Sequence, residues 1–139
     1  MKILIMGLPG SGKTWLGKRI AEYYGVPLWD ADVVRSVYND CDFSDYGRKQ
    51  QALRMRKLAE CDPISVSCFI CPLPSSMIIF SPDQIIWMDT IQKGKYEDTN
   101  KLFTKPFNYD VRIKTLINEK KLYKTMRSNA IHDLCGHLT

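Results

Sequence analysis

The stretch that decides the fold is an apolar run followed by a glycine-rich turn: Ile3-Leu4-Ile5-Met6, then Gly7-Leu8-Pro9-Gly10-Ser11-Gly12-Lys13-Thr14. The eight residues of the turn satisfy the pattern G-x-x-x-x-G-K-[ST], which joins a strand to a helix in phosphate-binding loops. The context matches, because a short apolar strand precedes the turn and an amphipathic helical pattern follows it. A plain glycine turn is the other reading, and the complete pattern in this context favours phosphate binding.

Each part of the turn has a chemical task. Its glycines let the backbone bend tightly and bring successive N–H groups around phosphate oxygens. The helix that begins at Lys13 adds the positive end of its dipole. The Lys13 ammonium is predicted to be a catalytic group on the β- and γ-phosphates, and the Thr14 hydroxyl is a predicted Mg²⁺ ligand. We therefore expect all eight residues to bind ATP together with Mg²⁺.

Several nucleotide-binding classes share this loop. A guanine-reading N-K-x-D is missing from the chain, and large ATPases need far more than 139 residues. What remains is the class of compact kinases, in which the segment after the second strand builds the acceptor site.

Beyond the turn, apolar stretches of strand length alternate with helical patterns, which predicts a parallel sheet covered by helices on both faces. We expect one domain over 1–139 with a three-layer α/β phosphate-loop fold and a mostly parallel sheet of about five strands. Residues 72–76 are predicted to form a turn, and 89–108 a mobile loop that closes over the substrates. The expected strands are 2–6, 26–29, 64–71, 83–88 and 109–113, and the expected helices are 13–24, 32–38, 45–59 and 115–134.

Composition and charge narrow the class of protein further. Apolar residues make up 45% and charged residues 25%, as in ordinary globular domains. No apolar run is long enough to span a membrane or to form a secretory signal, and five cysteines without such a signal indicate free thiols. The net charge of +5 suits an anionic small molecule. We expect a cytoplasmic protein with a small-molecule substrate, and not a membrane or nucleic-acid partner.

A second group of polar residues, Asp30-Ala31-Asp32-Val33-Val34-Arg35, follows the second predicted strand. In an open parallel sheet that edge faces the same crevice as the phosphate loop. Two carboxylates there could hold a metal-bound water or orient an acceptor hydroxyl, with Arg35 on the same helical face as Asp32. The alternative is a helix cap formed by Asp32 next to a surface arginine.

Together with Phe43-Ser44-Asp45-Tyr46-Gly47-Arg48, these stretches resemble the adenylylsulfate kinase (APS kinase) family of P-loop kinases. That family shows G-L-S-G-[AS]-G-K-[ST], then D-G-D-x-x-R, then G-F-S-x-x-D-R-x-x-N-x-x-R. Weaker similarity continues through Ile70-Cys71-Pro72, Met88-Asp89-Thr90 and Lys101-Leu102-Phe103-Thr104. The chain looks like a compact form, because its lid over 91–100 is short and offers only Lys93 and Lys95.

The resemblance implies a role for each matching position. Asp32 would lie at the 3′-hydroxyl of adenosine 5′-phosphosulfate, and Asp30 would support it or the Mg²⁺. The substrate-binding residues implied are Asp32, Arg35, Phe43, Arg48, Gln51, Lys101 and Phe103, with the two arginines on the phosphosulfate and the two phenylalanines on either side of the adenine. Gln51 stands where the family has Asn, and Gly47 where it has Asp. Many relatives form homodimers.

The sequence leaves two alternatives open. The chain could be a P-loop kinase for another acceptor, such as a nucleoside, a sugar acid or a polynucleotide 5′-hydroxyl. It could also be a non-catalytic protein that binds ATP, which the short lid would favour.

Overall fold

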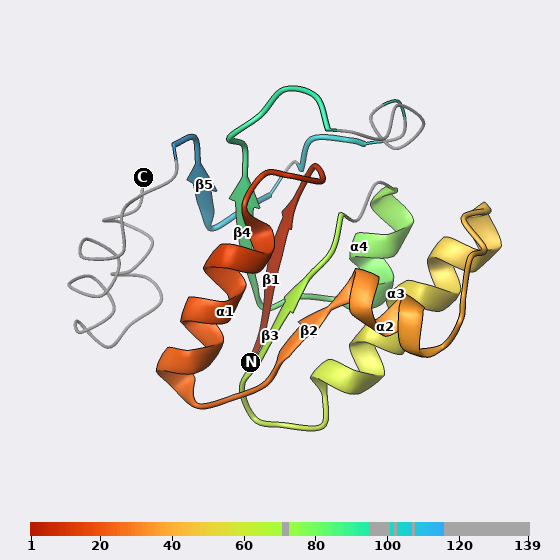
Figure 1. Ribbon diagram of the computed structural model, residues 1–139, viewed down its shortest axis with the longest axis horizontal. Helices are drawn as coiled ribbons and strands as arrows, with labels where there is room; N and C mark the ends of the chain where they lie inside the picture. Colours follow the sequence, from red (N-terminus) through yellow and green to blue (C-terminus); the bar gives the residue numbers. More distant parts are fainter. Residues whose placement is uncertain (71–72, 95–100, 102, 107, 116–139) are drawn as a thin grey trace.

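A central parallel sheet organises the structure, a computed structural model that describes residues 1–70, 73–94, 101, 103–106 and 108–115 (Figure 1). Its strands are β1 (Lys2–Gly7), β2 (Leu28–Asp30), β3 (Ser65–Cys68), β4 (Gln84–Met88) and β5 (Val111–Ile113). They lie in the order β2-β3-β1-β4-β5, and each neighbouring pair is parallel. The carboxyl ends of all five strands therefore meet at one edge.

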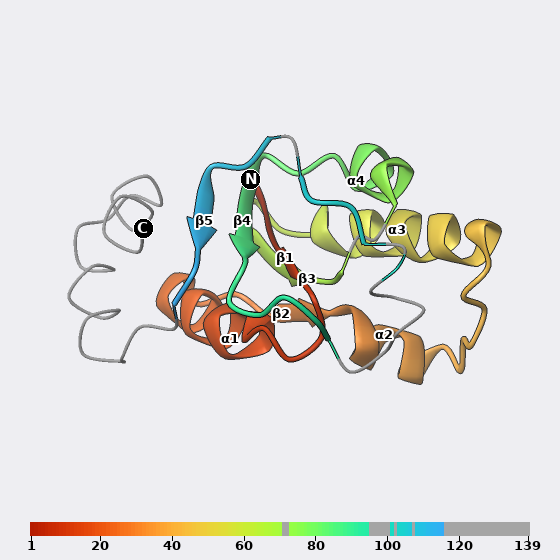
Figure 2. The ribbon, with the colours of Figure 1, turned by 90° about the horizontal axis from the view of Figure 1, so that it is seen from above.

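Helices cover both faces of this sheet. One face carries α1 (Lys13–Tyr24), and the other carries α3 (Asp45–Ala59) and α4 (Pro74–Phe80), so that the sheet lies between the two layers (Figure 2). The short α2 (Ala31–Val37) follows β2 directly. The three-layer α/β fold predicted from the alternating pattern is thus confirmed. Within the part of the chain that the structure describes, no helix has the length and apolarity needed to cross a bilayer.

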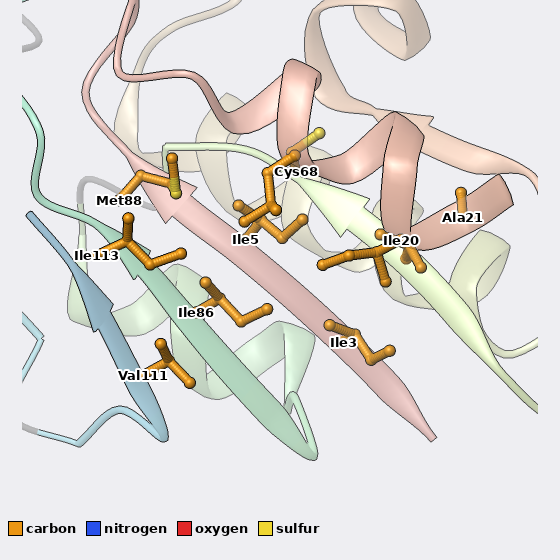
Figure 3. Close-up of a cluster of buried hydrophobic side chains, with 11 residues drawn as sticks. Ile3, Ile5, Ile20, Ala21, Cys68, Ile86, Met88, Val111 and Ile113 are labelled. Atoms are coloured by element: carbon orange, nitrogen blue, oxygen red, sulfur yellow. The ribbon is translucent and has the colours of Figure 1, made fainter. Parts of the chain in front are cut away.

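The central strand β1 shows why an unbroken apolar run was needed. Successive side chains of a strand point to opposite faces, so Ile3 and Ile5 pack against α1 while Leu4 and Met6 pack toward α3 and α4. All four are at most 1% exposed, and burying such a side chain contributes about 1.5–3 kcal/mol. Ile3 and Ile5 belong to a cluster of buried side chains that also includes residues of α1, β3, β4 and β5 (Figure 3).

Helices α1 and α3 match their predicted bounds. Gly25 ends α1 in a left-handed conformation with φ 65°, where glycine is favoured. Ser44 caps α3 by accepting a hydrogen bond from the Gly47 N–H. The inward face of α3 includes Ala52, Met55 and Ala59.

Several boundaries differ from the prediction. Strand β2 begins at Leu28, because the Val26 N–H still bonds to the Ala21 carbonyl at 3.0 Å and belongs to the end of α1. Helix α2 is capped by Asp30 and not by Asp32, since an Asp30 carboxylate oxygen accepts the Asp32 N–H at 2.9 Å. The predicted turn over 72–76 instead contains the start of α4, where Pro74 occupies the first turn, a position that favours proline.

Predicted elements in the second half of the chain also differ in their bounds or lie outside the described residues. Strand β3 ends at Cys68, and β4 and β5 are each shorter than predicted by one or two residues. Cys71, Lys95 and most of the predicted helix over 115–134 lie outside the described residues.

Candidate active site

A cavity of about 390 Å³ opens at the carboxyl edge of the sheet, between the glycine-rich turn and α2, α3 and α4. It brings together most of the residues singled out in the sequence, although they come from separate segments of the chain. Those that line it are Pro9, Gly10, Gly12, Lys13, Thr14, Asp30, Asp32, Arg35, Phe43, Arg48 and Gln51. Residues predicted to bind ATP and residues predicted to bind the acceptor therefore line one cavity.

The turn from Gly7 to Thr14, called the cradle below, is shaped by close backbone contacts. A Cβ at Gly7 would lie 2.6 Å from the Met88 carbonyl oxygen, so no larger residue fits there. Gly12 has φ 98°, which a residue with a side chain rarely adopts. The Lys13 ammonium already lies in the cradle, where it donates to the Leu8 carbonyl oxygen at 3.0 Å.

Thr14 and Asp30 meet at the bottom of the cavity. The Thr14 hydroxyl donates to one Asp30 carboxylate oxygen at 2.9 Å, while the other caps α2. A hydroxyl and a carboxylate are hard oxygen ligands of the kind that Mg²⁺ takes alongside phosphates and waters. These two residues therefore fit a Mg²⁺ bound mainly by a nucleotide. In the described ranges no cluster of three His, Cys, Asp or Glu side chains forms a metal site of its own.

Asp32 lies one residue into α2 and faces the same cavity. Its residue is exposed, and within the described part of the chain its carboxylate has neither a hydrogen bond nor an ion pair. A carboxylate in this state can accept a hydrogen bond from a hydroxyl placed in the cavity.

Three arginines gather on α2 and α3 beyond Asp32. Asp40 bridges two of them, with Arg35 at 3.3 Å and Arg54 at 3.1 Å from its carboxylate oxygens. The pKa of Asp40 is lowered, first by the hydrogen bond from the Asp42 N–H and then by Arg54 and Arg35. Burial is the main cause that lowers the pKa of Arg35, and Arg48 and Arg54 add to it.

Arg48 differs from the other two because it has no carboxylate partner among the residues that the structure describes. It is only 8% exposed, and its Nε donates to the Phe43 carbonyl oxygen at 2.8 Å. Its guanidinium lies 5.5 Å from the Phe43 ring centre, and that of Arg35 lies at 4.4 Å. The Phe43 ring is thus held beside two guanidinium groups at the end of the cavity formed by α2 and α3.

The loop before α3 explains the glycine at position 47. A Cβ there would lie 2.2 Å from the Asp42 carbonyl oxygen and 2.4 Å from the Asp42 carboxyl carbon. The Asp42 carboxylate in turn accepts hydrogen bonds from the Ser44 N–H and hydroxyl, at 3.0 and 2.5 Å, which lower its pKa. The carboxyl group of Asp42 therefore lies where a side chain at position 47 would begin.

Two predicted substrate residues do not line the cavity. Lys101 is exposed, and Phe103 is half-buried against the cluster that contains Leu4, Met55 and Phe80. Phe43 and Phe103 therefore do not enclose a common space in this structure. Contacts of Lys101 and Phe103 with a substrate stay predictions for a state with ligands bound.

Several residues that the sequence did not single out also line the cavity: Trp15, Ala31, Cys68, Phe69, Ile70 and Ser76. Cys68 ends β3 next to Asp30, and burial together with that carboxylate raises the pKa of its thiol to about 12. The signal that could have found Cys68 and Phe69 is their place at the carboxyl end of a buried parallel strand, which ligand sites in such sheets face.

Comparisons with known proteins agree with this fold. No model of a known protein family matches the chain. A curated shikimate kinase of Chlamydia pneumoniae is 35% identical over 63 residues, which is 45% of this chain and 36% of that enzyme. The matched part thus spans about a third of the curated relative, and the identity alone does not assign the chain to a family.

Solved structures of kinases match over most of the chain. The APS kinase of Mycobacterium tuberculosis is 21% identical with a TM-score of 0.60, over 96% of this chain and 94% of that one. A gluconokinase of Sinorhizobium meliloti is 14% identical with a TM-score of 0.66, over 98% and 90%. The shikimate kinase of Acinetobacter baumannii, solved with shikimate, is 16% identical with a TM-score of 0.53, over 72% and 64%. At these identities the likeness shows the fold, which this chain shares with P-loop kinases.

Proposed function

We propose that this protein is a kinase that transfers the γ-phosphoryl group of ATP to a hydroxyl of a small anionic acceptor. We further propose that this acceptor is the 3′-hydroxyl of adenosine 5′-phosphosulfate. The observation that carries the proposal is the buried Arg48 guanidinium, which lines the same cavity as the cradle and Asp32. A buried charge is costly unless an opposite charge meets it, so an anionic group of the acceptor is its natural partner.

The residues divide the work of phosphoryl transfer along the cavity. This reaction depends on in-line placement and charge neutralisation more than on covalent chemistry. Backbone N–H groups of the cradle and the Lys13 ammonium hold the β- and γ-phosphates. Asp32 accepts the hydrogen bond of the acceptor hydroxyl and takes its proton as the oxygen attacks. Arg35 and Arg48 hold the anionic group of the acceptor and so fix the line of attack.

Thr14 and Asp30 are the residues that would hold Mg²⁺ with the nucleotide. When bound there, Mg²⁺ would supply neutralisation of the charge on the phosphate oxygens. Gln51 has a supporting part, because its amide donates to the Ala31 carbonyl oxygen at 3.1 Å and accepts from Arg54 at 2.7 Å. It thereby ties α3 to the start of α2, where Asp32 lies.

The second candidate acceptor is a hydroxy acid that carries a carboxylate, such as a sugar acid. The observation that favours it is the 63-residue match to a shikimate kinase. Its sequence identity of 35% is higher than that of any solved kinase described above. A planar carboxylate also suits a guanidinium fork. The open Phe43 ring, 55% exposed, favours the nucleotide acceptor, because it offers an aromatic face for a base.

The test is a transfer assay with labelled ATP and separate acceptors. Adenosine 5′-phosphosulfate, shikimate, gluconate and a 5′-hydroxyl oligonucleotide are each supplied with Mg²⁺. Transfer to the phosphosulfate supports the proposed acceptor, and transfer to shikimate or gluconate alone moves the assignment to the second candidate. Label on the oligonucleotide alone, or on none of the four, contradicts the proposal of a small anionic acceptor.

Two variants on one helix then locate the acceptor. Arg48→Met should raise the KM for the acceptor by roughly 10- to 100-fold, because a charged hydrogen bond is worth about 1.5–3 kcal/mol. The KM for ATP should stay unchanged. Lys49→Met removes a charge from the next, exposed residue and is the matched control. Equal effects of the two variants would reject Arg48 as the acceptor contact.

A further inference from the structure

We propose that Thr90 is a positioning residue of the cradle, which holds the peptide between Ser11 and Gly12 with its N–H toward the phosphates. The inference rests on the proposed binding of ATP and concerns a residue outside the cavity lining. Its basis is a single long-range contact: the Thr90 hydroxyl donates to the Ser11 carbonyl oxygen at 2.7 Å, across 79 residues of sequence.

The end of β4 and the residues that follow it contact the cradle. The Met88 carbonyl oxygen is the atom that leaves no room for a Cβ at Gly7. The residue after Thr90 also approaches the turn, because the Ile91 side chain would lie 3.8 Å from a Cβ placed at Gly10. Three contacts, from Met88, Thr90 and Ile91, thus follow one another along the underside of the turn.

The geometry of the peptide bond links this contact to the phosphates. A trans peptide is planar, with its C=O and N–H pointing in opposite directions. Because the Ser11 oxygen points toward Thr90, the Gly12 N–H points away from Thr90. Gly12 itself lines the cavity. The hydrogen bond on the underside of the turn therefore aims a donor at its upper side.

The turn needs such a fixed point because its own backbone restrains this peptide poorly. Gly10 and Gly12 flank Ser11, and both have positive φ angles, 87° and 98°. The peptide between Ser11 and Gly12 rotates by changes in ψ of Ser11 and φ of Gly12. Glycine populates positive and negative φ about equally, so Gly12 offers little resistance to that rotation. Rotation would turn the Ser11 carbonyl oxygen toward the phosphates, where its partial negative charge would repel them.

Thr90 is itself held by the sheet. The N–H of the preceding Asp89 donates to the Ile113 carbonyl oxygen at 2.8 Å. The Asp89 carboxylate accepts two hydrogen bonds from Arg112, at 2.6 and 2.9 Å, and the Arg112 guanidinium lies 4.7 Å from the Trp87 ring centre. Strand β5 thereby fixes the position from which Thr90 reaches the cradle.

The test compares three variants by binding of ATP and of inorganic tripolyphosphate. Thr90→Val keeps the shape of the side chain and removes the donor, so both ligands should bind about tenfold more weakly. Thr90→Ser keeps the donor and should restore affinity to within about twofold of the unaltered protein. Thr115→Val, at an exposed threonine outside the cradle and outside the loop over 89–108, is the matched control and should change neither affinity.

A positioning role for Thr90 can be distinguished from a merely structural role by kinetics and by the melting temperature. Positioning should raise the KM for ATP while kcat at saturating ATP and the melting temperature stay close to those of the unaltered protein. The inference is overturned if Thr90→Val binds both ligands normally, or if Thr90→Ser is as weak as Thr90→Val. Should Thr90→Val fail to fold, Thr90→Ser with reduced affinity would count against the inference. Failure of ATP binding altogether appears instead in the unaltered protein, so the two proposals fail separately.

Discussion

The two ends of the cavity are built in different ways. The cradle presents backbone N–H groups, and its shape follows from glycines and from the carbonyl oxygen of Met88 beneath it. The end proposed to bind the acceptor presents side chains from α2 and α3, whose directions depend on the loop over 38–44 and on Asp40 between Arg35 and Arg54. We therefore expect a substitution in the cradle to weaken the binding of ATP. A substitution at the end proposed for the acceptor should affect only the binding or reaction of the acceptor.

The largest effect is expected from Lys13→Ala. This change removes the ammonium proposed to contact the β- and γ-phosphates, and we expect loss of that charge to lower phosphoryl transfer by roughly 10³-fold or more. Binding of ATP should weaken as well, which isothermal titration calorimetry measures. Unchanged affinity for ATP would contradict the assignment of the cradle.

Asp32→Asn should separate the two ends cleanly. The amide cannot take the proton of the acceptor hydroxyl, so the transfer rate should fall by about 10²–10⁴-fold. Binding of ATP should stay within about twofold, because Asp32 is proposed to contact the acceptor and not the phosphates, and the Asp30 cap of α2 is retained. Calorimetry checks the binding and labelled ATP the transfer. An equal loss of both would place Asp32 with the nucleotide instead.

A matched pair of glycine variants tests the comparison through packing. Gly7→Ala places a Cβ 2.6 Å from the Met88 carbonyl oxygen, and Gly47→Ala places one 2.2 Å from that of Asp42. Each should lower the free energy of unfolding by about 1–3 kcal/mol. Gly7→Ala should raise the KM for ATP, and Gly47→Ala that for the acceptor, because the Asp42 loop carries Phe43. Urea denaturation and initial rates measure the two effects, and a reversed pattern would refute the division.

The smallest effect concerns Cys68, which lies where the two ends meet. Burial raises the pKa of its thiol from 9.0 to about 12, so at pH 8 almost none is thiolate. Iodoacetamide should modify the exposed Cys41 and Cys61 at least about 100-fold faster. Peptide mass spectrometry measures the rates, and modification of all three in urea is the control. Fast alkylation of Cys68 in the folded protein would contradict its burial.

The same thiol gives a pH dependence with a defined sign. Its folded pKa lies above its ordinary value, so the folded state binds the proton more tightly than the unfolded state. Stability from the neutral thiol should be intact below about pH 9 and should fall as the pH rises from there toward about 12. Urea midpoints of the unaltered protein and of Cys68→Ser, compared at pH 8 and pH 10, should diverge less at the higher pH.

The cradle and the sheet were predictable because they follow from local sequence. The continuous apolar run Ile3, Leu4, Ile5 and Met6 predicts a strand buried on both faces, because successive side chains point to opposite faces. The glycine spacing predicts the turn. The loop that joins α2 to α3 was not predictable, because Asn39 adopts φ 51° there and Asp42 occupies the space beside Gly47. Periodicity carries no information about either.

Contacts between distant segments were equally beyond the sequence. The hydrogen bond from Thr90 to Ser11 joins residues 79 positions apart, and no spacing rule connects them. The start of α4 was missed for a different reason. Pro74, Ser75 and Ser76 are common in turns and equally suited to the first turn of a helix, and only the burial of Phe80 decides between the two.

The order of the cavity residues along the chain has a consequence for engineering. Those that line the cavity run from Pro9 to Ser76, and the ones assigned to the acceptor fall between Asp32 and Gln51, on two consecutive helices. If the proposed roles hold, we expect that grafting the corresponding helices of a known P-loop kinase between β2 and β3 alters acceptor choice and leaves the predicted phosphate-binding residues unchanged.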